Sequence, residues 1–221
     1  MTGAIFSMTF STTSLGIADY MSSPTRTKFT IAEPFPEGGW YTDVSRFARL
    51  AHKNLAELEH LAAEASAKWP KPPGVPLGEA DAEPELAALV EERDAASDVT
   101  LLFAAMAVEA FLNFYGAVRF GEAEYRNHFE RLGLVPKLQQ LLLICDSWSI
   151  AKNDPLVKAL QVVAEGRNEL AHPKAWKDHA NNQGKHLKPI PGAAQEAVKA
   201  MTTFFEEFKS LVPESKHFMP L

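Results

Sequence analysis

After residue 41, apolar residues recur every three or four positions along most of the chain, which is the period of amphipathic helices. The first such pattern follows Thr42, a residue type that caps helix N-termini, and predicts a long helix over residues 42–69. The segment 70–83 is rich in proline, which has no backbone N–H to continue a helix, so we expect a linker there.

A second helical pattern begins at Pro84, a residue suited to the first helical turn, and extends to about Phe120. Between Val99 and Phe114 this pattern is almost wholly apolar, so we expect burial on nearly all sides. No strand pattern follows residue 41. The same periodicity predicts further helices over residues 122–131, 135–148, from 155 up to Pro173, and 193–211.

These elements predict an all-α fold, in which residues 84–212 form an antiparallel helical bundle preceded by one long helix. Residues 1–41, rich in Ser, Thr, Pro and Gly, are expected to form an irregular N-terminal arm, and residues 213–221 a C-terminal tail. We also expect the last and the longest apolar helices to leave an exposed seam through which the chain forms a homodimer.

Composition indicates a globular chain, because 46% of its residues are apolar and 23% are charged. The single cysteine, Cys145, lies in an apolar run, cannot form an internal disulfide and is expected in the core. The sequence has no uninterrupted apolar run of about 18 residues, and its start lacks the basic flank of a secretory signal. We therefore expect a cytoplasmic protein with no membrane span.

The formal charge of −6 argues against a surface that coats nucleic acid along its length. The charge is unevenly distributed, because residues 1–100 hold 8 Lys and Arg against 15 Asp and Glu, whereas residues 101–221 hold 14 against 13. A local positive patch is therefore compatible with overall acidity. Residues 167–188 hold Arg167, Lys174, Lys177, Lys185 and Lys188 against Glu169 and Asp178.

The strongest chemical signal in this basic region is the pair Arg167 and His172, which lie five residues apart near the end of a predicted helix. At about 100° per residue they are roughly 140° apart around the axis, whereas Asn168 shares the face of His172 and can orient its ring. An arginine fork suits phosphate, and histidine transfers protons near neutral pH. On spacing alone, a structural interpretation is favoured, with Arg167 paired to a carboxylate and His172 capping the helix.

Three segments shift that balance, because together they resemble the HEPN family over roughly residues 95–210. The segment Glu165-Gly-Arg-Asn-Glu-Leu-Ala-His-Pro173 resembles the Arg-Asn-x-x-x-His signature of that family. Upstream, Ala105-Met-Ala-Val-Glu-Ala-Phe-Leu-Asn-Phe114 is similar to an earlier family helix with a Glu and an Asn four residues apart, here Glu109 and Asn113. Between them, Gly133-Leu-Val-Pro-Lys-Leu-Gln-Gln-Leu-Leu142 is similar to the connecting helix.

The resemblance implies a dimeric helical bundle that cleaves RNA without metal or other cofactor, through attack of the ribose 2′-hydroxyl. It implies that Arg167 holds the scissile phosphate, that His172 is the general acid or base, and that Asn168 orients the pair. Lys174 and Lys177 are expected to contact RNA, and an antitoxin or another protein is a further expected partner in a toxin–antitoxin or phage-defence setting.

Two alternatives stay open at this point. Glu109 and Asn113 either brace Arg167 from the neighbouring helix, which we favour, or satisfy buried polar groups. The whole domain is either a ribonuclease or a non-catalytic HEPN-like module for interaction or nucleotide binding.

Other candidate sites have weaker support in the sequence. His172, His179 and His186 recur every seven residues, but prolines and a glycine interrupt this segment, and it has no cysteine or close carboxylate pair to complete a zinc site. The phenylalanines near the end of the chain are expected to form a core stripe: Phe204, Phe205 and Phe208.

Overall fold

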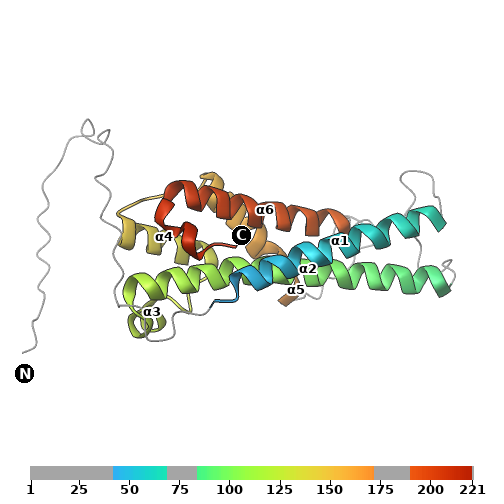
Figure 1. Cartoon of the computed structure of the whole chain (residues 1–221), viewed down its shortest axis with the longest axis horizontal. Coiled ribbons are helices and arrows are strands. Elements are labelled where there is room, and N and C mark those ends of the chain that lie inside the picture. Colours follow the sequence, from blue (N-terminus) through green and yellow to red (C-terminus); the bar gives the residue numbers. More distant parts are fainter. Residues whose placement is uncertain (1–41, 69–83, 172–189, 221) are drawn as a thin grey trace, which may run out of the picture.

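The structure, a computed structural model, describes residues 42–68, 84–171 and 190–220. Within these ranges every regular element is helical, and the helices pack as a bundle (Figure 1). The all-α bundle predicted from the sequence is therefore confirmed. Its elements are α1 (Val44–Lys68), α2 (Pro84–Phe120), α3 (Glu122–His128), α4 (Leu134–Asp146), α5 (Pro155–Ala171), α6 (Ile190–Leu211) and the 3-10 helix η3 (Pro213–Phe218).

The long helices lie side by side, with α1 antiparallel to both α2 and α6 (Figure 1). Three residues of α1, Val44, Ala48 and Ala51, are buried in the same core as α2 and α6. The bundle therefore begins at α1, although the sequence pattern alone had placed its start at residue 84.

Helix α2 lies at the centre of this core. Its Phe111 meets the rings of Phe204, Phe205 and Phe208 edge-on, at centroid distances of 6.0, 5.5 and 4.9 Å. All three α6 rings are buried, which confirms the predicted core stripe. Aromatic pairs in this arrangement add to the free energy gained by burying their area.

By length and composition, α2 is long and apolar enough to cross a membrane, although the sequence has no uninterrupted apolar run of about 18 residues. Nevertheless, 61% of its most apolar 18-residue window is buried inside the bundle. The central helix of a globular bundle has the same composition, because its neighbours cover it on most sides.

Helix starts follow the capping signals in the sequence. The Leu156 N–H donates to the Asp154 carboxylate at 2.9 Å at the start of α5, and the Val44 N–H donates to Thr42 Oγ1 at 3.4 Å. Helix α6 begins at Ile190, earlier than predicted, because a proline is tolerated in the first turn of a helix.

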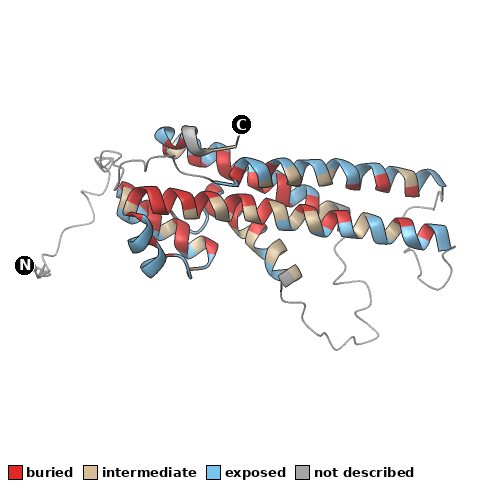
Figure 2. Cartoon of the chain, turned by 60° about the horizontal axis from the view of Figure 1, so that its bottom comes forward, coloured by how far each residue is buried: buried red, intermediate tan, exposed pale blue. Residues whose placement is uncertain are grey.

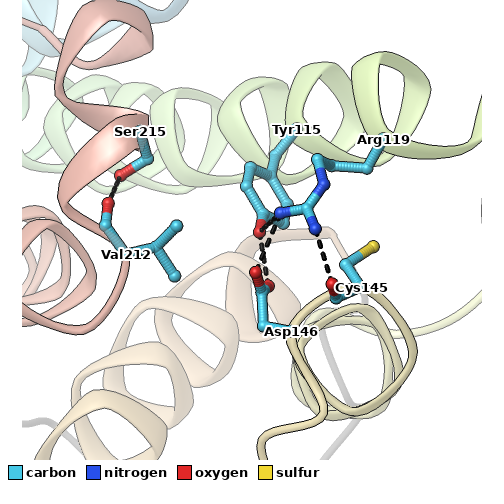
Figure 3. A network of polar contacts seen from close by, with 6 residues as sticks. All are labelled: Tyr115, Arg119, Cys145, Asp146, Val212 and Ser215. Carbon is cyan, nitrogen blue, oxygen red and sulfur yellow. Dashed lines mark hydrogen bonds and ion pairs between the residues drawn. The ribbon is translucent and has the colours of Figure 1, made fainter. Parts of the chain in front are cut away.

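The segment after α6 is structured, and the apolar face of α6 is covered by its neighbours. The tail after residue 212 contains η3, and both Val212 and Ser215 are fully buried, with the Ser215 hydroxyl donating to the Val212 carbonyl at 2.6 Å (Figure 3). The last helix contributes none of the exposed large apolar side chains among the described residues, since its apolar face packs on α2. Those side chains are Leu102, Leu143, Ile144 and Val162 on α2, α4 and α5.

Candidate functional site

Arg167 lies in the last two turns of α5 and reaches across to α2. Its guanidinium forms an ion pair with the Glu109 carboxylate at 3.4 Å, and its side chain stays 40% exposed. The structure thus brings together two of the residues selected from the sequence. Because Arg167 has several donors, Glu109 can fix its orientation while other N–H groups face solvent.

The residue before Arg167 is a glycine, and its small size matters for the approach of α5 to α2. A Cβ atom built on Gly166 would lie 2.9 Å from the Cδ2 atom of Leu101 on α2. The absence of a side chain at Gly166 therefore lets α5 and α2 approach closely. This close approach lies next to Arg167, whose side chain reaches Glu109 on α2.

Asn113 lies one turn beyond Glu109 on α2, but its side-chain oxygen bonds to α3 and α4 and not to Arg167. This oxygen accepts hydrogen bonds from the Tyr125 hydroxyl of α3 at 2.6 Å and from the Lys137 ammonium of α4 at 2.8 Å. Of the two roles considered for this pair of residues, Glu109 braces Arg167 and Asn113 satisfies buried polar groups.

Lys137 is fully buried, which is costly for a charged group unless partners compensate. Burial lowers the pKa of Lys137 below its ordinary value, and Arg167 lowers it further, whereas Glu109 and Glu130 act in the opposite direction. Burial also raises the pKa of the Tyr125 phenol, and Glu130 and Glu109 add to the rise. Hydrogen bonds and charge interactions among these side chains therefore connect α2, α3, α4 and α5.

We call this group the α2–α5 polar cluster; it consists of Glu109, Asn113, Tyr125, Lys137 and Arg167. A pocket of about 300 Å³ lies beside it, and Asn113 and Tyr125 are part of its lining. The other polar side chains of this pocket are largely acidic, and they are Thr42, Asp43, Glu122, Arg126 and Glu130.

The remaining site residues from the sequence are only partly described. Asn168 is exposed on α5. His172, Lys174 and Lys177 lie outside the described residues, as do His179 and His186 of the weaker metal hypothesis. Within the described ranges, no three His, Cys, Asp or Glu side chains form a group able to hold a metal ion.

A second polar network joins α2 to the end of α4, and sequence reasoning missed it (Figure 3). The Arg119 guanidinium donates to the Asp146 carboxylate at 2.8 Å and to the Cys145 carbonyl at 2.5 Å, while the Tyr115 hydroxyl donates to Asp146 at 2.5 Å. The side chains of Arg119 and Asp146 are each only 2% exposed. This buried network fastens two helices together and is closed to substrate.

The thiol of Cys145 is half-buried beside the same network. Burial raises the pKa of this thiol to about 12. It is therefore protonated near neutral pH, which does not suit a nucleophile.

Searches with the sequence and with the structure found no matching family model, no matching curated protein and no matching solved structure.

Proposed function

We propose that the chain is a metal-independent endoribonuclease of the HEPN type. Arg167 would bind the scissile phosphate and His172 would transfer the proton as the ribose 2′-hydroxyl attacks, leaving a 2′,3′-cyclic phosphate. The observation that carries the proposal is the Arg167–Glu109 ion pair, because it holds a half-exposed guanidinium in place without burying it. A pre-oriented, solvent-accessible arginine can bind phosphate at little further entropic cost.

The test uses Arg167→Ala, His172→Ala and the double variant on a pool of structured and single-stranded RNA. We expect each single variant to lose nearly as much cleavage as the double variant, because residues that act as one catalytic unit are strongly non-additive. Cleavage should persist in EDTA, and RNA with 2′-deoxy substitutions at the cut sites should stay intact.

Arg46→Ala is the matched control, since Arg46 of α1 is also exposed and pairs at 3.5 Å with the carboxylate of Asp43, which precedes the helix. It should cleave like the wild type. Activity lost in EDTA and restored by magnesium, or an unchanged His172→Ala enzyme, would refute the proposed mechanism.

The proposed ribonuclease acts as a homodimer in which each chain supplies one Arg167 and one His172 to a shared cleft. Sedimentation velocity at micromolar concentration should give the mass of two chains. A monomer that nevertheless cleaves RNA would exclude a composite site.

A non-catalytic binding module is the second candidate, and two observations favour it. Tyr125 and Lys137 both donate hydrogen bonds to the side-chain oxygen of Asn113, which stabilises the fold without any substrate. The pocket beside them is also rich in carboxylates, which repel phosphate. Wild-type protein that cleaves no RNA, together with a sharply lower melting temperature for His172→Ala, would favour this function.

A further inference from the structure

A second pocket, of about 390 Å³, lies between α1, α6 and the chain that follows α6. After α6 this chain folds back toward the middle of the bundle (Figure 1). None of the residues of the α2–α5 polar cluster lines this pocket, so it is a separate feature of the molecule.

The floor of this pocket is apolar and its rim is basic. Ala48, Met201 and Phe205 are buried at the floor, and Met219 is half-buried beside them. The rim is formed by exposed polar side chains, which include two lysines, one arginine and one glutamate: Arg49, Lys209, Lys216, His52, Thr202 and Glu206.

Each of the three cations keeps N–H donors for a ligand, although the Nε–H of Arg49 donates to the Ser45 carbonyl at 3.3 Å. Within the part of the chain that the structure describes, none of Arg49, Lys209 and Lys216 forms an ion pair with a carboxylate. A basic rim of this kind is unexpected by composition, because the chain as a whole has a charge of −6. The acidic pocket beside Asn113 shows the opposite distribution of charge.

We propose that this pocket binds a small organic anion with an alkyl chain, of the class of medium-chain carboxylates. The chain would pack on Met201, Phe205 and Met219, and methionine side chains adapt their shape to such a ligand. The carboxylate would lie at the rim beside Lys209 and Lys216. Ligand pockets commonly measure about 300–1,000 Å³, so the volume here suits a small molecule.

Isothermal titration calorimetry with three ten-carbon probes tests both features of the pocket. The probes are decanoate, 1-decanol and decyltrimethylammonium, each used below its micellar concentration. Decanoate should bind about tenfold more tightly than 1-decanol, and the cation should bind most weakly, because complementary charge adds to burial of the chain. Equal affinity for the three probes, or no binding of decanoate, would overturn the proposal.

Charge reversal locates the site. Lys209→Glu and Lys216→Glu should each weaken decanoate binding roughly tenfold, because an attraction becomes a repulsion. Lys158→Glu is the matched control: it makes the same change of net charge at a pocket between α5 and α6, and it should leave the affinity unchanged. Circular dichroism checks that all variants are folded. Equal losses in all three variants, or no loss at Lys209 and Lys216, would show that decanoate binds elsewhere.

Discussion

At the scale of single residues, two basic side chains are buried among the described residues, in different surroundings. Arg119 meets a carboxylate, and although burial opposes its charge, Tyr115 and Asp146 raise the pKa of its guanidinium above the ordinary value. Lys137 meets the neutral oxygen of Asn113 and an aromatic ring, and its pKa is lowered. The two residues should therefore respond differently to substitution.

The lowered pKa of Lys137 makes its contribution to stability dependent on pH. Between this lowered pKa and the ordinary value of about 10.4, the unfolded chain binds the proton more readily than the folded chain. This contribution therefore raises the free energy of unfolding as pH rises through that window. Lys137→Met lacks this contribution. The free energy of unfolding of the wild type minus that of the variant should therefore increase as the pH rises toward the ordinary pKa of lysine, about 10.4. Urea titrations at several pH values measure this difference, and a flat or falling curve would contradict the assignment.

Arg119 should be far less tolerant of replacement than an exposed arginine. Arg119→Met leaves Asp146 buried without its cation, which commonly costs about 3–5 kcal/mol. Arg126→Met is the control, because Arg126 pairs with Glu122 on the surface of α3, where such pairs contribute under about 1 kcal/mol. Urea unfolding compares the two, and similar losses would show that the buried pair has no special role.

The sequence indicated some of these residues and not others. Glu109 and Arg167 could be selected because a motif places them in adjacent helices, and the structure joins them. The sequence did not indicate that Lys137 and Asp146 take part in buried polar networks. Both lie in α4, and a charged residue in an amphipathic helix is ordinarily expected on its exposed face. Their partners are 24 and 27 residues away, a separation that helical periodicity cannot detect.

At the scale of elements, local signals placed most helices well. The Asp154-Pro155 pair predicted the start of α5, because it combines a capping side chain with a first-turn proline. The end of α3 was placed too late. The chain turns after His128, where the Leu132 N–H donates to the Phe129 carbonyl at 3.0 Å, and a tight turn of this kind leaves no mark on hydrophobic spacing.

The packing of α3 on α2 depends on Gly116. A Cβ atom at this position would lie 2.4 Å from two carbon atoms of the Tyr125 ring, and the ring is held in place by the bond to Asn113. Gly116→Ala should therefore destabilise the fold by about 1–3 kcal/mol, the usual cost of overpacking. Thermal unfolding measures this change.

Gly192→Ala is the matched control for that substitution. Among the described residues, nothing lies within 4 Å of a Cβ atom at Gly192, which is in the first turns of α6. The variant should be as stable as the wild type or more stable by about 0.4–1 kcal/mol, because alanine loses less entropy in a helix. A loss at Gly192 equal to that at Gly116 would refute the steric explanation.

At the scale of the whole molecule, burial is concentrated toward one end. The larger core cluster contains most of the buried apolar side chains, whereas the outer ends of α1 and α2 are mostly exposed (Figure 2). The core of that outer region is small, and its members are Leu58, Leu61, Ala65, Leu89, Ala96 and Ala194.

Amide hydrogen exchange should follow this gradient of burial along α2. Amides between Ala104 and Val118 should exchange only through global unfolding, while those between Leu86 and Ala96 should exchange sooner through local opening, because few apolar contacts oppose it. Mass spectrometry of peptides from the two halves measures the rates. Equal protection along the helix would show that the bundle opens as one unit.

The position of the two polar networks on α2 determines which packing of the bundle is allowed. Glu109 and Asn113, one turn apart on α2, belong to the first network. Tyr115 and Arg119, also one turn apart, belong to the second network. The second pair lies six residues further along α2 and therefore points roughly 120° away around the helix axis. A smooth apolar helix can slide or rotate against its neighbours at little cost. Here any rotation of α2 would break both networks at once, so the same few polar groups exclude the alternative registers that the apolar surface by itself would permit.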